Sequence, residues 1–99
     1  MIIVDQVSLS YKVTQKEGMV VTDMDHEKVM LSIENGKYYN LGEVGGEIWE
    51  LIAKPIEVSQ VIAALLEQYQ VDYSECMEQV IAFLNHLLRE NLIHVEEVR

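Results

Sequence analysis

Hydrophobic and polar residues alternate with a period of two through much of the first 42 residues, which is the pattern of half-buried β-strands. Ser8–Thr14 alternates in this way, and Met19–Thr22 fits either a short strand or part of a loop. Glu27–Glu34 and Lys37–Leu41 are two further apolar runs, both expected to be strands. This part of the chain therefore predicts an antiparallel sheet of three strands.

The dipeptide Asn35-Gly36 separates the last two runs and indicates a two-residue hairpin turn of type I′. Such a turn pairs Ser32 with Tyr39 and sorts the side chains of both strands onto two faces. One face carries Val29, Leu31, Ile33 and Tyr38, and the other carries Met30, Tyr39 and Leu41. Both faces are partly apolar, so we expect each of them to contact another surface.

The apolar period changes to that of a helix after Gly42, which is a candidate N-cap. The first predicted helix is Glu43–Ala53. Its Gly45 and Gly46 are poor helix formers, and either a close approach by another element or a late helix start explains them. The second predicted helix is Val58–Tyr69, with apolar residues along one side.

The third predicted helix, Tyr73–Asn91, has the clearest start in the chain. Asp72 fits the N-cap and Glu75 fits the third position of a capping box. Asn91 is expected to cap the other end. Leu92–Val98 is expected either to add a short strand or to trail across the surface.

Strands followed by helices define an α+β fold class. We expect an N-terminal antiparallel three-stranded sheet followed by three helices, with the short connection Gln70-Val71 between the last two helices. A hairpin beside such a helix pair is a winged helix-turn-helix-like arrangement. A chain of 99 residues without repeats or linkers predicts a single domain over residues 1–99.

Composition places this domain among folded proteins, because 49% of its residues are hydrophobic. No apolar run approaches the roughly 18 residues that a membrane-spanning helix needs. The first residues have neither the basic segment nor the cleavage site of a signal peptide, which favours the cytoplasm. Cys76 is the single cysteine, so we interpret it as a small buried residue rather than a reactive thiol.

The net charge of −10 is concentrated in the second half of the chain, where residues 43–99 hold eleven acids against three bases. Such a surface repels phosphate and attracts basic partners. The third helix carries Glu75, Glu78 and Glu90 against Arg89 alone. This charge argues against a winged-helix DNA-binding regulator, which is kept as the rival hypothesis, as is a generic protein-interaction subunit.

Catalytic and metal-binding patterns do not emerge from the sequence. His26, His86 and His94 are scattered and form no known ligand spacing. Cys76 and His86 lie ten residues apart on one predicted helix, about 15 Å along its axis, which is too far for a hydrogen bond. We therefore expect no metal, no cofactor and no enzymatic activity.

The central part of the chain resembles the PqqD family. The resemblance is carried by VMLSIENGKYYNLGEVGGEIWELI (Val29–Ile52), which joins an apolar strand, a Gly turn, a Tyr-Tyr-x-Leu strand and an Ile-Trp-x-Leu helix. It continues through LLEQYQVD (Leu65–Asp72) and LLRENLI (Leu87–Ile93). Two positions depart from the family pattern: Gly42 stands where Asn or Asp is usual, and Glu57 stands where Ser or Thr is common.

The resemblance implies a non-catalytic element that binds the leader segment of a ribosomally made, modified precursor peptide. The leader would add a strand to Lys37–Leu41 and lie against the third helix. A free-standing chain of this size looks most like the version from lasso-peptide clusters, which delivers the precursor to a transglutaminase-like cysteine protease and then to a cyclase. The alternative is a PqqD-like chaperone for a radical-SAM enzyme.

An edge strand beside an apolar helix fits peptide binding by strand addition on physical grounds as well. We expect an apolar leader residue near Leu41 and Ile81, and basic leader residues near Glu75 or Glu78. Whether Tyr38 or Tyr39 faces the groove is left open. The candidate binding residues on the strands are Val29, Leu31, Lys37, Tyr38, Tyr39, Asn40 and Leu41. Those on the third helix are Tyr73, Glu75, Met77, Glu78, Val80, Ile81 and Leu84.

Overall fold

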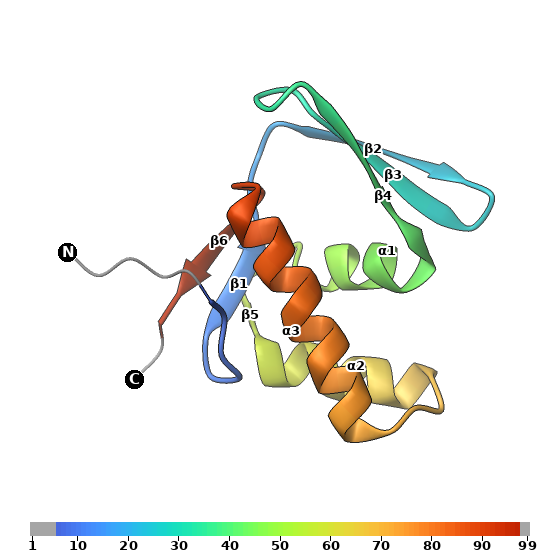
Figure 1. The fold of residues 1–99 in the computed structure, drawn as a ribbon, viewed down its shortest axis with the longest axis vertical. Helices are drawn as coiled ribbons and strands as arrows, with labels where there is room; N and C mark the ends of the chain where they lie inside the picture. The colour runs from blue at the N-terminus through green and yellow to red at the C-terminus, as the bar shows by residue number, and fades with distance from the viewer. Residues whose placement is uncertain (1–5, 98–99) are drawn as a thin grey trace.

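The computed structural model describes residues 6–97, and residues 1–5 and 98–99 lie outside the description (Figure 1). Its elements are β1 (Lys12–Gln15), β2 (Met19–Met24), β3 (Glu27–Ser32), β4 (Lys37–Leu41), α1 (Gly42–Leu51), β5 (Ile56–Glu57), α2 (Val58–Gln68), α3 (Tyr73–Arg89) and β6 (Ile93–Glu96). The expected α+β class is confirmed, and the three predicted helices are present. No helix within the described range is long and apolar enough to cross a membrane.

The strands form two sheets rather than the single expected one. β2, β3 and β4 are neighbours in one antiparallel sheet, whereas β1 lies between β5 and β6 in the other. Val13 of β1 pairs with Ile56 on one side and with Val95 on the other. β5 has only two residues, which is too short for a periodic pattern to be visible in the sequence.

The hydrophobic core is formed by the three helices and residues of both sheets. Figure 1 shows the β2-β3-β4 sheet on one side of the helices, with α1 beneath it and α3 running across the molecule. The largest side chains with almost no solvent exposure are Val13, Met30, Ile52, Val58, Val61, Ile62, Leu65, Val80, Leu84, Leu87, Leu92 and Ile93. Every helix except α1 thus supplies several of them, and α1 adds the buried Ile48 and Trp49.

The β3–β4 hairpin corrects the predicted turn. The structure pairs Ser32 with Lys37, two residues earlier than predicted, so that residues 33–36 form a four-residue loop. Gly36 has a positive φ of 65°, but Asn35 does not, which excludes type I′. The side chain of Ser32 accepts a hydrogen bond from the Asn35 amide at 3.1 Å and stabilises this wider loop. Because the shift is two residues, the predicted faces are preserved within the two strands, but Ile33 lies in the loop and belongs to neither face.

The two glycines of α1 mark close contacts with other elements. A Cβ added to Gly45 would lie 3.0 Å from Cε1 of Phe83, and one added to Gly46 would lie 3.0 Å from Cγ of Lys28. Since α1 already begins at Gly42, the alternative of a late helix start is wrong.

The predicted cap of α3 is wrong in its hydrogen bonds, although the helix begins where expected. Asp72 occupies the N-cap, but its side chain makes no capping bond. Glu75 is instead 3.4 Å from the side-chain amide of Gln79, one turn further along. A capping box does form at α2, where the side chains of Glu57 and Gln60 bond to each other's backbone amides. The departure of Glu57 from the family pattern therefore leaves this helix capped.

The C-terminal end of α3 reverses sharply into β6. The C-cap is Glu90, and the next residue, Asn91, has a left-handed φ of 64°. The Leu92 amide donates to the Leu87 carbonyl at 2.9 Å and the Asn91 amide to the Leu88 carbonyl at 3.0 Å, which is a Schellman motif. Of the two alternatives for the segment that follows, the strand is the correct one.

Candidate functional site

β4 is an edge strand, as expected. It pairs with β3 on one side, and within the described residues no strand pairs with its other side. A free edge presents backbone N–H and C=O groups that an extended chain can complete. Alternation places Lys37, Tyr39 and Leu41 on the face toward α1 and α3, whereas Tyr38 lies on the opposite face and is 75% exposed. The geometry therefore selects Tyr39 as the tyrosine beside α3.

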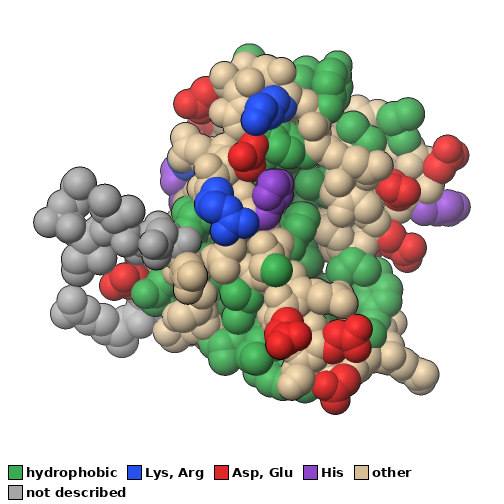
Figure 2. Space-filling model, viewed as in Figure 1, with side chains coloured by type: hydrophobic (Ala, Val, Ile, Leu, Met, Phe, Trp, Pro, Cys, Tyr) green, Lys and Arg blue, Asp and Glu red, His purple; other side chains and the backbone are tan. Residues whose placement is uncertain are grey.

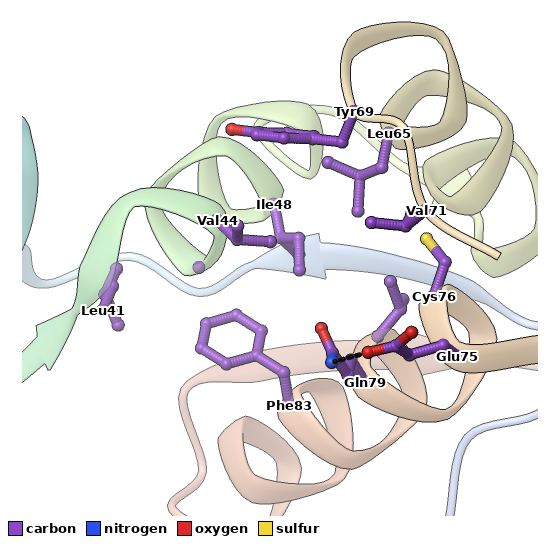
Figure 3. A pocket seen from close by; sticks show the side chains of 12 residues that line it. Leu41, Val44, Ile48, Leu65, Tyr69, Val71, Glu75, Cys76, Gln79 and Phe83 are labelled. Atoms are coloured by element: carbon purple, nitrogen blue, oxygen red, sulfur yellow. Dashed lines mark hydrogen bonds between the residues drawn. The ribbon is translucent and has the colours of Figure 1, made fainter.

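A largely apolar cavity of about 250 Å³ opens at the end of β4, between α1, the α2–α3 connection and the first half of α3 (Figure 3). Figure 3 shows Phe83, Val44 and Leu41 around one end and Cys76, Val71 and Leu65 around the other. Its lining consists of Leu41, Val44, Gly45, Ile48, Leu65, Tyr69, Val71, Glu75, Cys76, Gln79, Val80 and Phe83. We call the free edge of β4 together with this cavity the β4–α3 groove.

One side of α3 forms a wall of this groove. The residues Glu75, Gln79, Phe83, His86 and Glu90 recur every three or four positions and therefore share a side of the helix. The first three line the cavity, and the last contacts β4. His86 falls between these two positions. Among these five, only Glu75 was expected from the sequence.

The groove contains only some of the expected site residues. Leu41, Glu75 and Val80 line the cavity, and Lys37 and Tyr39 lie on the same face of β4. Two others, Met77 and Ile81, are half-buried but do not line it, while Leu84 is fully buried in the core. The remaining expected residues also lie outside the cavity lining: Val29, Leu31, Tyr38, Asn40, Tyr73 and Glu78.

Ile81 and Met77 lie outside the lining of the cavity that contains Leu41, whereas the sequence led us to expect one leader residue near both Leu41 and Ile81. Asn85, one turn after Ile81, accepts a hydrogen bond from the Val7 amide at 2.8 Å, so this side of the helix packs against the N-terminal segment. The apolar stripe of α3 is wide because it includes the buried core residues and the half-buried residues on either side of them, Phe83 on one side and Met77 and Ile81 on the other. Its sequence does not distinguish the margin that faces the groove from the margin that faces residue 7.

The residues that sequence reasoning missed come mainly from α1 and from the margin of the α3 stripe. Val44 and Val71 are 40% and 44% exposed at the rim of the cavity, and Phe83 is half-buried within it. A signal for Phe83 was present in the paired glycines of α1, because such a pair indicates a bulky neighbour. The sequence does not say which residue that neighbour is.

Acidic groups surround the cavity. Burial raises the pKa of the Tyr69 hydroxyl, and the nearby carboxylates of Glu43 and Glu47 raise it further. Burial also raises the pKa of the Cys76 thiol, which keeps it protonated and unreactive. Figure 2 shows Asp and Glu side chains over the end where α3 begins, and Lys, Arg and His near the other end. In its first and last turns α3 indeed carries Glu75 and then His86 and Arg89.

The basic end of the groove contains a set of hydrogen bonds that joins β4 to α3. Glu90 Oε1 accepts a hydrogen bond from Tyr39 Oη at 2.7 Å and lies 3.6 Å from Lys37 Nζ. The side chain of Asn35 donates to the Glu90 carbonyl at 2.8 Å and to Tyr39 Oη at 3.0 Å. The hydrogen bond from Tyr39 holds the pKa of Glu90 below its usual range, with help from Lys37 and His86.

The other polar side chains of the described residues do not form a metal site or leave an unpaired lysine in the polar hollow. Within residues 6–97, no three His, Cys, Asp or Glu side chains lie together in a way that would hold a metal ion. A separate, polar hollow lies between β2–β3 and α1 and contains Lys28. The Lys28 ammonium is paired with Asp23 at 2.7 Å and with Glu50 at 3.2 Å. The contact with Asp23 contributes most to raising the pKa of Lys28, and the contact with Glu50 raises it further, so Lys28 remains a cation.

A free strand edge beside an apolar groove is the arrangement of small domains that bind extended peptides. The chain belongs to the PqqD family: the family model for coenzyme PQQ synthesis protein D matches residues 27–93. Comparison with curated protein sequences finds no match.

Three solved structures share the fold. A TbiB1 structure, in complex with the TbiA(beta) leader peptide, has a TM-score of 0.72 at 26% identity, over 82% of this chain and 94% of that one. A lasso peptide synthetase B1 complexed with the leader peptide has a TM-score of 0.71 at 17% identity, over 83% and 96%. The PqqD truncation of Methylobacterium extorquens PqqCD, described as a stand-alone recognition element for ribosomally synthesized and modified peptides, has a TM-score of 0.70 at 16% identity, over 84% and 88%.

Proposed function

We propose that this protein binds the leader segment of a ribosomally made precursor peptide as an added strand on β4. The observation that carries the proposal is the free edge of β4 beside the apolar cavity at its end. Family membership supports it, as does the likeness to two structures that contain a leader peptide. Strand addition supplies main-chain hydrogen bonds that depend little on sequence, so side-chain pockets must supply specificity.

The β4–α3 groove suits an apolar side chain flanked by basic ones. Leu41, Val44 and Phe83 offer apolar surface to one leader side chain. Glu75 lines the cavity, and the carboxylates of Glu43 and Glu47 are close enough to Tyr69 to raise its pKa, so this region carries a negative charge that attracts Lys or Arg. We therefore assign the helix contacts to Phe83 and Gln79 in place of Ile81 and Met77.

The protein would carry the peptide to other enzymes without changing it chemically. In this proposal it acts in the cytoplasm and presents the leader to a transglutaminase-like cysteine protease and then to a cyclase, as in lasso-peptide assembly. A radical-SAM enzyme is the alternative recipient. The neighbouring genes distinguish the two, because each recipient is a separate and easily identified protein class.

The test is titration of a labelled leader peptide, taken from a precursor gene identified near this one, with two variants. Phe83→Asp places a carboxylate in the apolar cavity and should weaken binding by about 2–3 kcal/mol, or roughly 30- to 150-fold. Ile33→Asp also introduces a carboxylate, but in the β3–β4 loop, where Ile33 is 67% exposed, and this variant should bind as the wild type does.

Wild-type affinity is expected between about micromolar and tens of nanomolar. Circular dichroism must show that both variants remain folded. Equal affinities of folded Phe83→Asp and wild type would place the peptide outside this groove. A leader with ester linkages in place of alternate amides should bind more weakly, and an unchanged affinity would rule out strand addition.

A further inference from the structure

The tip of the β3–β4 hairpin is fastened to the last turn of α3 by the polar contacts of one residue, Glu90. Its carboxylate accepts from Tyr39 at 2.7 Å and pairs with Lys37 at 3.6 Å, and its carbonyl accepts from Asn35 at 2.8 Å. Asn35 also donates to the Tyr39 hydroxyl at 3.0 Å, which joins the contacts into one network. We call these four residues the hairpin latch.

The strengths of these contacts are unequal. The ion pair contributes little, because the Lys37 side chain is 63% exposed and solvent screens it. The Glu90 side chain is only 28% exposed, and its hydrogen bond with Tyr39 joins a charged acceptor to a hydroxyl, which makes it a short and strong one. The Glu90 carbonyl belongs to the end of a helix, where such groups lack a partner within the helix, and Asn35 supplies one.

The latch joins β4 to α3 at the end of the β4–α3 groove that lies away from the cavity. At the cavity end, the walls are held together by α1, whose Gly45 allows Phe83 to approach. At the other end, the latch joins β4 directly to α3. The β2-β3-β4 sheet packs on α1, with Lys28 over Gly46, so a change at the latch would let the sheet tilt about this contact.

We propose that Glu90 is a positioning residue that holds β4 at the separation from α3 that an added peptide strand requires. This inference rests on the proposed function, because it concerns the same groove. The latch makes the groove ready before the peptide arrives, and Glu90 itself need not touch the peptide.

A positioning role has a kinetic consequence. If removing the latch lowers the fraction of molecules with a ready groove to about one tenth, the apparent Kd rises about tenfold. The loss then falls on the association rate, while the dissociation rate of the bound peptide stays nearly the same. A residue that contacts the peptide shows the reverse, because lost contacts mainly raise the dissociation rate.

The experiment measures association and dissociation rates of the same leader peptide on three variants. Glu90→Ala should lower the association rate about tenfold. Glu90→Gln should lie between the wild type and Glu90→Ala, because its amide oxygen still accepts from Tyr39 but lacks the charge that strengthens this bond. Glu34→Ala, an exposed residue of the same hairpin loop, should leave both rates unchanged. The proposal would be overturned if both rates are unchanged in Glu90→Ala, or if only the dissociation rate rises.

Hydrogen exchange without peptide tests the latch independently of the proposed function. In Glu90→Ala, amides of residues 37–41 should exchange faster, while those of residues 13–15 in β1 keep their wild-type rates. Uniformly faster exchange would indicate a general loss of stability, and unchanged exchange would show that the latch does not hold the hairpin; either result refutes the positioning role. Failure of the wild type to bind any leader would refute the proposed function but leave this exchange result valid.

Discussion

Adding one methyl group at Gly45 should damage peptide binding, whereas the same change at Gly46 should not. Neither glycine has a positive φ, so alanine fits the backbone at both positions. A Cβ at Gly45 would lie 3.0 Å and 3.1 Å from two ring atoms of Phe83. A Cβ at Gly46 would lie 3.0 Å from Cγ and 3.2 Å from Cβ of Lys28, on the other side of α1 from the cavity.

The magnitudes follow from these distances. Favourable carbon contacts begin near 3.5 Å, so the Phe83 ring must retreat by about 0.5 Å, toward the cavity that it lines. Overpacking of this kind costs about 1–3 kcal/mol, and alanine regains about 1 kcal/mol of helix propensity. Because the added methyl group is equally close to its neighbour at both positions, Gly45→Ala and Gly46→Ala should each lose up to about 2 kcal/mol of folding stability.

The two variants should differ in their affinity for the leader peptide. A displaced ring fills part of a cavity of about 250 Å³, and we expect Gly45→Ala to bind the leader about five- to thirtyfold more weakly. Gly46→Ala should bind within about twofold of wild type. Urea unfolding and fluorescence titration measure both quantities on the same samples. Normal leader binding by Gly45→Ala together with impaired binding by Gly46→Ala would refute the role of the Gly45–Phe83 contact in shaping the cavity.

Three further predictions concern charge. Glu75→Lys should weaken leader binding about threefold to tenfold at low salt and less at high salt, whereas Glu78→Lys, outside the cavity lining, should not; equal effects would contradict the assigned side of α3. Duplex DNA should show no gel shift even at low salt, and a retarded band that weakens steeply as salt rises would favour the DNA-binding rival. The hydrogen bond from Tyr39 lowers the pKa of Glu90, and Lys37 and His86 add to this effect; the neighbouring Arg89 is also a cation. The stabilisation that depends on the Glu90 carboxylate is therefore complete above the ordinary glutamate pKa of about 4.3. It is lost as pH falls through the lowered pKa. Hairpin amides should then exchange faster, after correction for intrinsic rates, only in that acid range, and exchange that stays unchanged there would contradict this role of the Glu90 carboxylate.

Elements with a long periodic pattern were predictable from the sequence. The helix Tyr73–Arg89 begins at the expected residue because its apolar spacing runs for four turns, which outweighs local ambiguity. The edge position of Lys37–Leu41 followed from a short strand that has only one hairpin partner. The faces of the hairpin also survived, since a register shift of two residues preserves alternation.

Features that depend on a single side chain or on a distant partner were not predictable. Ser32 widens the hairpin loop by bonding to the Asn35 amide, and turn statistics for Asn-Gly do not contain that bond. The β5-β1-β6 sheet joins residues near the two ends of the domain with a strand of two residues, Ile56–Glu57, that carries no pattern. The groove side of α3 was missed because half-buried residues flank the core on both margins of the helix.

The two roles of α3 explain how variants on this helix should be interpreted. Val80 is 1% exposed and also lines the cavity, so its truncation removes core packing and cavity wall together. Leu84 is fully buried and outside the lining, so its truncation would weaken binding only through the fold, at a cost of about 2–5 kcal/mol of stability. Phe83 and Gln79 face the cavity from the margin of the core, where a change in affinity need not follow a change in stability. A specific peptide site therefore requires that affinity and stability vary together at Leu84 and separately at Phe83.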